Sequence, residues 1–280
     1  MCPDPLFFDS SNIHMYGVMI AVGILCCFGV LFLFGKLRGI DSDYIDFVFY
    51  NGIASIAIGF FFAALFQGVY NYIDHPELGF SLTNGITFIG GIIGGIASFL
   101  TIYFIFRKKV KGNLMDIIDI APCCILIAHA FGRIGCFCAP CCWGKPTDSF
   151  LGVKFPGFDH AVHPTMLYEA VFLFILFGVC CFLFLKYNTK QNLSIYLIAY
   201  GLFRFFIEYL RGDERGSFIP GISPSQFWSI IMVLAGVALF VYIYYITKKK
   251  PSTEAIQSQE NTPTPLKEEA EVNESDSTEI

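Results

Sequence analysis

Long runs of hydrophobic residues alternate along this chain with short polar segments. A helix of roughly 20 apolar residues is long enough to cross the ~30 Å hydrocarbon core of a bilayer. The fourth and sixth of these runs end in a Gly and Arg cluster, where a helix can tilt or break. The pattern predicts an all-α integral membrane protein with seven transmembrane helices, at residues 14–34, 47–70, 86–106, 114–132, 165–185, 193–210 and 224–246.

The composition agrees with a membrane protein and separates the chain into two parts. Hydrophobic residues make up 55% of the 280 positions and charged residues only 15%, which is outside the range of soluble globular proteins. Residues 1–250 form the predicted membrane domain. Residues 251–280 are rich in Glu, Ser, Thr and Pro, which predicts a disordered acidic cytoplasmic tail. The net charge of −5 owes much to this tail, and we expect no nucleic-acid partner.

The basic residues of the short loops predict the orientation of the helices. Positive charge close to helix ends is retained on the cytoplasmic side. Four basic clusters follow the first, third, fifth and seventh runs, at 36–38, 107–111, 186–190 and 248–250. We therefore expect the N-terminus outside, the C-terminus inside and the long 133–164 loop outside. The first ten residues lack a basic start and a small-residue cleavage site, so we expect the first helix to be retained.

Several charged residues fall within the predicted helices on the outer side. Arg133 ends the fourth run, and Arg204, Glu208 and Arg211 follow one another along the sixth at spacings that place them on one helix face. One interpretation is a structural ion pair at a helix end. The other is an anion site, because Arg204 lies almost two turns inside the apolar run and the planar guanidinium matches phosphate oxygens.

Three further stretches are polar or glycine-rich where a helix facing lipid would be apolar. "IHMYG" carries His14 and Tyr16, and is also typical of an interfacial aromatic belt. "HPTMLYEA" carries His163, Tyr168 and Glu169; its proline and acid are ordinary signals of a helix start, although Glu169 should lie below the headgroups. The glycines of "NGITFIGGIIGG" allow either close helix packing or close approach of a ligand.

Taken together and in this order, these stretches resemble the prolipoprotein diacylglyceryl transferase family. The resemblance covers about residues 12–245 and rests on "IHMYG", "GITFIGGIIGG", "GRIGCFCAPCCWG", "HPTMLYEA", "YGLFRFFIEYLRGDERG" and "GISPSQFWSI". It implies transfer of the diacylglyceryl group of phosphatidylglycerol to the sulfhydryl of the lipobox cysteine of a prolipoprotein, with release of glycerol phosphate. It also implies a bacterial cytoplasmic membrane protein with its active site toward the outer leaflet.

The resemblance implies roles for particular residues. Arg133 and Arg204 match the arginines of two family signatures, and we expect them to stabilise the growing charge of the leaving phosphate. Tyr16 matches a tyrosine implicated in the family site, and is assigned to catalysis with them. Glu208 and Arg211 are expected to orient Arg204 and to shape the headgroup pocket. The remaining substrate-binding residues are predicted to be Cys136, Gly144, His163, Tyr168 and Glu169.

The chain departs from the family pattern at three positions. Ile89 stands where the family commonly has a histidine, and Cys136 and Cys141 stand where it commonly has an asparagine and an acid. His129 precedes Arg133 by four residues, so a helix there places both on one face. We hypothesise that His129 supplies the base that Ile89 lacks, since histidine transfers protons readily near neutral pH. The alternative is a histidine hydrogen-bonded within the bundle.

The cysteines fall into two groups. Those within the helices are expected to act as small buried hydrophobic residues: Cys26, Cys27, Cys123, Cys124, Cys180 and Cys181. Cys136, Cys138, Cys141 and Cys142 are predicted to face outside, where disulfides persist, and a bond between Cys138 and Cys141 stays open. Four clustered cysteines suit zinc, but adjacent Cys141 and Cys142 are not expected to point at one ion. We assign no metal and no cofactor.

Two other functions fit parts of the sequence. A membrane thiol-disulfide oxidoreductase would use the Cys-x-x-Cys spacing of "CAPC", but it generally needs a second exposed pair, and outside the cluster only Cys2 is predicted to face out. It also leaves the row of arginine and glutamate unexplained. A non-catalytic lipid-binding relative or lipid transporter accommodates the altered positions.

Overall fold

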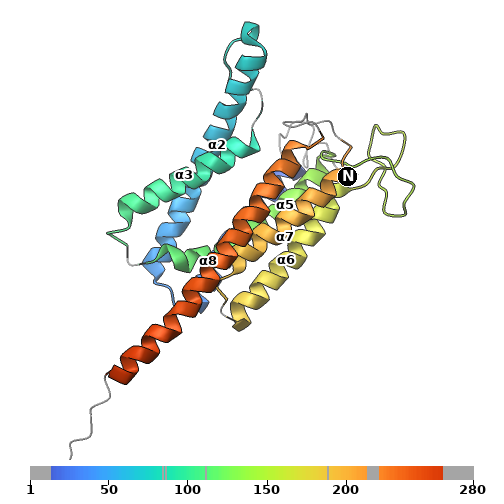
Figure 1. Cartoon of the computed structure of the whole chain (residues 1–280). Helices are drawn as coiled ribbons and strands as arrows, with labels where there is room; N and C mark the ends of the chain where they lie inside the picture. Colours follow the sequence, from blue (N-terminus) through green and yellow to red (C-terminus); the bar gives the residue numbers. More distant parts are fainter. Residues whose placement is uncertain are drawn as a thin grey trace, which may run out of the picture. The chain divides into compact units, whose positions relative to one another are not determined.

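A computed structural model describes residues 14–260 of the chain, except 84, 86, 111, 188 and 213–220. These residues form helices and loops without a regular strand, apart from three isolated β-bridges. The helices are α1 (Met15–Leu37), α2 (Ser42–Asp74), α3 (Phe88–Phe106), α4 (Leu114–Ile118), α5 (Ala121–Cys138), α6 (Thr165–Tyr187), α7 (Asn192–Ile207) and α8 (Pro224–Glu260), with short 3₁₀ turns η1 (Pro76–Leu78) and η2 (Glu208–Leu210) (Figure 1).

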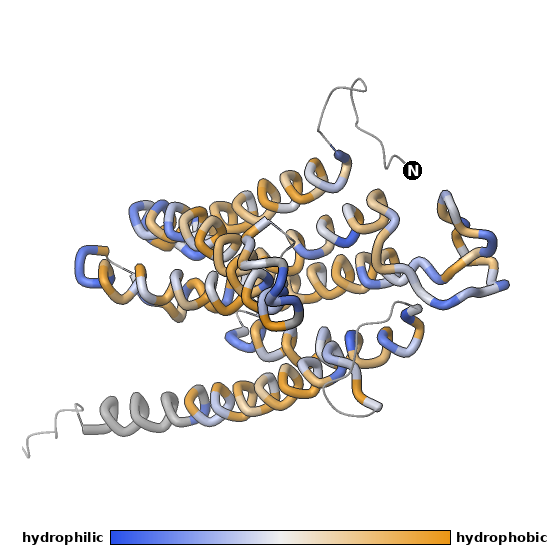
Figure 2. The backbone as a smooth tube through the Cα atoms, turned by 90° about the horizontal axis from the view of Figure 1, so that it is seen from above, coloured by the Kyte–Doolittle hydropathy of each residue, from blue (hydrophilic) through white to orange (hydrophobic). Residues whose placement is uncertain are grey.

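Seven helical segments of the described chain are long and apolar enough to cross a membrane, which confirms the predicted all-α membrane fold. Figure 2 shows that these helices are mostly hydrophobic along their length, with hydrophilic residues concentrated in the loops and at helix ends. The segments are Met15–Leu37, Ser42–Ile73, Ile89–Phe106, Leu114–Cys138, Thr165–Tyr187, Asn192–Leu210 and Pro224–Ile246.

The fourth membrane segment breaks at a different place from the one predicted. The sequence suggested a break at the Gly and Arg cluster, but α5 continues through Gly132 and Gly135 to Cys138. The interruption lies at Asp119 and Ile120, between α4 and α5, where Pro122 opens the new helix. Glycines are tolerated inside a membrane helix when its neighbours hold it in place. As a result, Cys136 and Cys138 belong to the helix, and the loop that follows begins at residue 139.

The second membrane helix is longer than predicted. α2 starts at Ser42 rather than at 47, because Asp41 caps it by accepting a hydrogen bond from the Asp43 amide at 2.9 Å. Acidic residues in a first turn stabilise a helix, but they end a purely hydrophobic run. The sequence pattern therefore placed this helix boundary too late.

Helices α5, α6 and α7 pack together and carry most of the polar residues of interest (Figure 1). α1 packs on α5, and α8 lies close to α7, where Gly201 leaves no room for a Cβ atom beside Val233. The main apolar core includes Ile120, Leu126 and Leu173, all fully buried. Three of the six cysteines within the membrane segments, Cys123, Cys124 and Cys180, are buried as expected, while Cys26, Cys27 and Cys181 are half-buried.

The glycines of α3 serve helix packing. A Cβ atom on Gly94 would lie 2.4 Å from Cβ of Phe62 on α2, and one on Gly90 would lie 2.7 Å from Cβ of Phe66. Small residues let two membrane helices approach closely. The structure thus favours the packing interpretation of this stretch.

The chain consists of two compact units, Met1–Phe240 and Val241–Ile280. All the residues predicted for the site belong to the first unit. α8 continues to Glu260, so it includes the first ten residues of the segment predicted to be disordered. Glu, Ala and Gln occur there and extend helices readily. Residues 261–280 lie outside the described part of the chain.

Candidate active site

Glu169 of α6 lies at the centre of a buried polar network. Its side chain is only 1% exposed, and its Oε1 atom lies 3.1 Å from Nη2 of Arg133 on α5. The hydroxyl of Tyr200 on α7 donates a hydrogen bond of 2.7 Å to the same oxygen. A buried carboxylate needs a cation and hydrogen-bond donors to offset its lost hydration. Glu169, Arg133 and Tyr200 therefore connect α5, α6 and α7 through one oxygen atom.

His129 joins this network one turn before Arg133 on the same face of α5, as the spacing predicts. Nε of Arg133 donates a hydrogen bond of 3.3 Å to Nε2 of His129, and that nitrogen lies 3.7 Å from Glu169. The imidazole packs edge-on against the Tyr200 ring with centroids 5.1 Å apart. A nitrogen that accepts from a guanidinium carries no proton, so this geometry corresponds to neutral imidazole. The lone pair of Nε2 therefore accepts the Arg133 hydrogen bond, and it can accept a proton once that hydrogen bond is broken.

Arg204 forms a second network one turn after Tyr200 on α7. Its Nη2 atom lies 2.8 Å from Oε2 of Glu208 and donates to Oγ of Ser225, at the start of α8, at 2.9 Å. Ser223 donates a hydrogen bond to the other Glu208 oxygen at 2.9 Å. The Arg204 side chain is 9% exposed, and its Nη1 atom is buried without a hydrogen-bond partner among the described residues. Burying an N–H donor without an acceptor is costly, which makes Nη1 a binding position for an oxygen ligand.

The charged row Arg204, Glu208 and Arg211 stays together, although the helix does not continue unchanged. α7 ends at Ile207, a 3₁₀ turn covers Glu208–Leu210, and Arg211 follows in extended conformation. Nε of Arg211 lies 4.0 Å from Oε2 of Glu208, and its side chain is only 3% exposed. The expected single helix face is therefore replaced by a tightened turn that keeps the three side chains near one another. The rest of the "RGDERG" stretch, from residue 213, lies outside the described residues.

The loop of residues 139–164 is fixed to this charged region at Gly144. The Gly144 amide donates to the His163 carbonyl at 2.8 Å, and the Lys145 amide donates to the Leu210 carbonyl at 2.8 Å. A Cβ atom on Gly144 would lie 2.6 Å from that Leu210 oxygen, so only glycine fits. Nδ1 of His163 lies 3.2 Å from the hydroxyl of Tyr168. Gly144, His163 and Tyr168, which the sequence predicts to bind substrate, therefore lie close together beside the end of α7.

Tyr16 reaches the site from the start of α1. Its ring carbon Cδ2 would lie 3.1 Å from a Cβ atom on Gly135, so Tyr16 covers the α5 segment two residues after Arg133. The residue is 42% exposed. The phenol lies close enough to the Cys136, Cys141 and Cys142 thiols and to Arg133 to interact with them electrostatically, and its exposure makes it accessible to a substrate. The same position suits an interfacial tyrosine. Ile89, which replaces the family histidine, is half-buried on α3.

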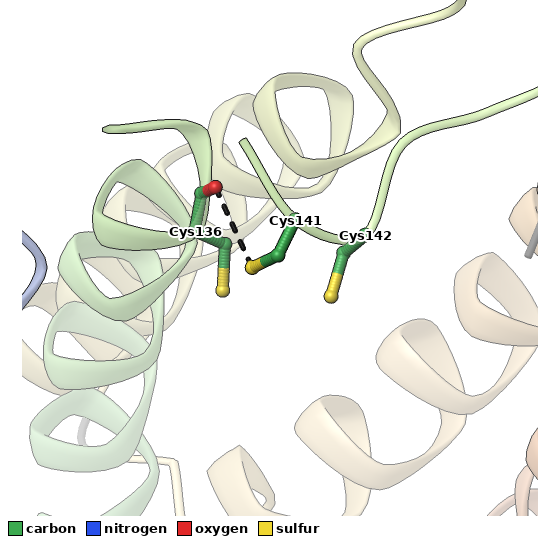
Figure 3. A group of neighbouring side chains, drawn as sticks. All are labelled: Cys136, Cys141 and Cys142. Atoms are coloured by element: carbon green, nitrogen blue, oxygen red, sulfur yellow. Dashed lines mark hydrogen bonds between the residues drawn. The ribbon is translucent and has the colours of Figure 1, made fainter. Parts of the chain in front are cut away.

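The four cysteines between residues 136 and 142 separate into a cluster of three and one other thiol. The Sγ atoms of Cys136, Cys141 and Cys142 all lie within 4.8 Å of one another, whereas Cys138 is outside this group (Figure 3). The ten cysteines of the described chain are all free thiols. The expectation that Cys141 and Cys142 cannot face one point is wrong. Cys142 adopts a positive φ of 64°, which turns its side chain back toward its neighbours.

The surrounding groups shift the pKa values of two of these thiols in opposite directions. Hydrogen bonds from Cys136 and Cys141, together with the Arg211 guanidinium, hold the pKa of the Cys142 thiol below its usual value. Donation toward Cys136 and Cys142, together with burial, raises the pKa of the Cys141 thiol. An adjacent cation favours a thiolate. Cys142 is therefore the residue of this pair that favours the anionic form.

Three polar residues of the two networks, Tyr200, Ser223 and Ser225, were not singled out from the sequence, although the quoted motifs contain them. Tyr200 lies within an apolar run, and Ser223 and Ser225 lie at the start of the next one. Their importance comes from partners that are distant in sequence, Glu169, Glu208 and Arg204. The spacing of Tyr200 and Arg204, four residues apart on α7, is the one signal that could have linked them.

A family model described as "Prolipoprotein diacylglyceryl transferase" matches residues 5–242. The chain belongs to this family. A phosphatidylglycerol–prolipoprotein diacylglyceryl transferase of Clostridium tetani is 35% identical over 248 residues, which cover 84% of this chain and 96% of the relative. A relative of Clostridium perfringens, named phosphatidylglycerol–prolipoprotein diacylglyceryl transferase 2, is 31% identical and covers 82% of this chain and 90% of its own length.

The match to the prolipoprotein diacylglyceryl transferase family includes all the residues that form the two networks. A third relative, from Pseudoalteromonas atlantica, has the same name as the Clostridium tetani protein, is 31% identical and covers 85% of this chain and 89% of its own length. The chain is therefore a multi-pass membrane member of a transferase family.

Proposed function

We propose that this protein transfers the diacylglyceryl group of phosphatidylglycerol to the sulfhydryl of the lipobox cysteine of prolipoproteins and releases glycerol phosphate. Membership of the family and the names of relatives that match over most of their length support this assignment. The structural observation that carries it is the buried Nη1 atom of Arg204, which has no hydrogen-bond partner in the described chain. Nη1 suits an oxygen of a lipid phosphate.

Arg204 and Arg133 stabilise the leaving phosphate in this proposal. As the glycerol carbon transfers to sulfur, the phosphodiester becomes a phosphate monoester and gains negative charge. Cations that are already in place lower the energy of that transition state without reorganisation. Glu208 and Ser225 hold the guanidinium of Arg204, and Glu169 holds that of Arg133. Both arginines are therefore positioned before the lipid arrives.

His129 is the proposed base for the acceptor thiol. The thiolate is the nucleophile, so the incoming cysteine must lose its proton. Nε2 of His129 accepts a hydrogen bond from Arg133 in the resting arrangement. When a phosphate oxygen takes over the hydrogen bond of Arg133 Nε, while Nη2 stays on Glu169, Nε2 of His129 is released and accepts the proton. Binding of the lipid and activation of the thiol are thereby coupled through one arginine.

The remaining residues shape the pocket in this proposal. Tyr16 covers the approach beside Arg133, and Arg211 and Glu208 set the position of Arg204. Cys136, Gly144, His163, Tyr168 and Glu169 form its walls. The site faces the outer leaflet of the bacterial cytoplasmic membrane, an orientation supported by the basic residues that follow alternate helices.

The test is a lipidation assay with the full-length protein in vesicles of phosphatidylglycerol and phosphatidylcholine. A peptide with a lipobox cysteine is added, and its mass is measured. The expected product carries one diacylglyceryl group in thioether linkage, and it fails to form with Arg204→Gln. Arg107→Gln, the same change at an exposed arginine at the end of α3, is the matched control and should keep full activity. Oxidised peptide without lipid would favour a thiol oxidoreductase, and no product would favour a lipid-binding relative.

A further inference from the structure

The cluster of Cys136, Cys141 and Cys142 has the geometry of a thiolate metal site. It is the one group of three or more potential metal-binding side chains found among the described residues, and its sulfur atoms all lie within 4.8 Å of one another. Tetrahedral zinc with Zn–S bonds of about 2.3 Å places its sulfurs about 3.8 Å apart. The three sulfurs therefore need to move together by at most about 1 Å.

The backbone holds the three cysteines in place. The amide and the thiol of Cys141 both point at the Cys136 carbonyl, at 3.1 and 3.6 Å (Figure 3). The carbonyl of Cys142 accepts a hydrogen bond of 2.7 Å from the hydroxyl of Thr165 at the start of α6. The loop next to the cluster is fixed again by the Gly144 amide. Binding an ion here would therefore cost little ordering of the chain.

The surrounding charges favour deprotonated ligands. Metals bind the thiolate form of cysteine, which a nearby cation stabilises. Arg211 contacts Cys142 from one side, and Arg133 lies about one turn before Cys136 on α5. Three thiolates and one divalent zinc ion sum to a single negative charge, which an adjacent guanidinium can offset.

We propose that Cys136, Cys141 and Cys142 bind one zinc ion through three thiolates and leave its fourth position open for the sulfur of the acceptor cysteine. Three protein ligands with one open position are the pattern of catalytic rather than structural zinc sites. The ion binding is independent of the proposed function, whereas the role of the open position rests on it.

The chemistry of the acceptor needs no oxidant. Bound zinc would lower the pKa of the acceptor thiol, His129 would take up its proton, and the ion would keep its charge. The sulfur then forms a bond to the glycerol carbon of the lipid while the bond from that carbon to the phosphate oxygen breaks. The electron pair of the broken bond leaves with glycerol phosphate.

The first test measures metal binding alone. The full-length protein in detergent, reduced and freed of metal with a chelator, is titrated with Co²⁺, whose thiolate bands report sulfur coordination, and then with Zn²⁺. We expect one ion per chain, with affinity reduced at least about tenfold in each of Cys136→Ser, Cys141→Ser and Cys142→Ser. Cys138→Ser, a change in the same segment outside the cluster, should bind normally. Absence of thiolate bands, or equal loss in Cys138→Ser, would overturn the site.

A rescue variant separates coordination from folding. Cys141→His replaces one zinc ligand by another and should bind Zn²⁺ more tightly than Cys141→Ser. If both variants unfold at the same temperature without metal but only the histidine variant is stabilised by Zn²⁺, coordination is supported. If neither is stabilised, the proposal fails.

The lipidation assay tests the role of the open position. Chelation should lower the rate at least about tenfold, and Zn²⁺ should restore it. Bound zinc with an unchanged rate after its removal would overturn the role in acceptor binding while the metal site stands. Lipidation by a protein that binds no zinc would overturn the metal site and leave the proposed function intact.

Discussion

Nη2 of Arg133 lies 3.1 Å from Oε1 of Glu169, a carboxylate whose side chain is 1% exposed. Neither residue has the same role without the other, because a buried charge that loses its partner is strongly unfavourable. The pair also connects α5 to α6, and Tyr200 extends the connection to α7. Glu169 therefore links three helices and, in the proposed mechanism, also positions the Arg133 cation for the lipid.

Replacing Glu169 with Gln should test that double role. The amide keeps the shape of the side chain but removes its charge, and leaves Arg133 uncompensated. We expect the free energy of unfolding in detergent to fall by about 3 kcal/mol and lipidation to fall at least about tenfold. Glu77→Gln, at an acid that is 68% exposed, is the control and should change neither quantity. Wild-type stability of Glu169→Gln would show that the carboxylate is not charged in the folded protein.

Arg204→Lys should separate charge from geometry. Lysine keeps the positive charge, but its three N–H donors share one atom and do not reproduce the planar fork in which Nη2 binds Glu208 and Ser225 and Nη1 is left for a phosphate oxygen. Loss of one donor to a transition-state charge typically lowers the rate about 100-fold. We expect kcat to fall by that order and KM to change little, since the interaction strengthens as the phosphate gains charge. An increase in KM alone would assign Arg204 to ground-state binding.

Two substitutions at His129 should distinguish a base from a hydrogen-bond partner. His129→Asn offers Arg133 an acceptor oxygen but cannot take up a proton at neutral pH, and His129→Ala offers neither. General base catalysis contributes about 100-fold or more, so we expect both variants to lose at least that much. Near wild-type activity in His129→Asn, with loss in His129→Ala, would mean that His129 only positions Arg133. Unchanged activity in both would exclude it from the reaction.

Gly144→Ala should weaken the attachment of the 139–164 loop to the end of α7. The added Cβ atom would lie 2.6 Å from the Leu210 carbonyl oxygen, so the loop has to move away from the end of α7. We expect the free energy of unfolding to fall by about 1–3 kcal/mol and the melting temperature to drop with it. Gly178→Ala, on α6 with nothing within 4 Å of the new Cβ, is the matched control, and it should be neutral or stabilising. A Gly144→Ala protein that melts with the wild type would mean that the loop is not fixed there.

The rate at which Cys142 is alkylated at low pH should depend on Arg211. The pKa of the Cys142 thiol is lowered by the neighbouring Cys136 and Cys141 thiols and by Arg211, so its reactive thiolate persists as the pH falls below the usual value for cysteine. In metal-free protein, labelling of Cys142 by a maleimide at pH 6 should be slower in Arg211→Gln than in the wild type. Mass mapping of the labelled peptides measures this rate. Equal rates would show that Arg211 does not stabilise the thiolate.

The sequence was sufficient for the seven membrane helices, because a bilayer imposes a long apolar run on each of them. It was also sufficient to bring His129 near Arg133 and Arg204 near Glu208, because these contacts lie within about two turns of a helix. It could not indicate that Glu169 faces Arg133 or that Ser223 faces Glu208. Those contacts depend on how separate helices pack, and hydrophobic patterning does not specify that packing.

For the cysteines between residues 136 and 142, the sequence argued against a contact that the structure contains. Spacing alone argued against Cys141 and Cys142 facing one ion, since adjacent side chains in ordinary conformations diverge. The positive φ of Cys142 removes that objection, and the hydrogen bond from Thr165 holds its carbonyl in place. A left-handed cysteine leaves no mark in a sequence, because the residues that favour this conformation are glycine, asparagine and aspartate.

Rescue of a bacterial cell that lacks its own diacylglyceryl transferase tests the central claim most directly. The measurement is the diacylglyceryl modification of a reporter lipoprotein, detected by mass spectrometry, with expression of each variant confirmed in the membrane fraction. The full-length protein and Arg107→Gln are predicted to restore the modification, whereas Arg204→Gln is predicted not to. A folded wild-type protein that leaves the reporter cysteine unmodified would contradict the assignment, and rescue by Arg204→Gln would contradict the phosphate site.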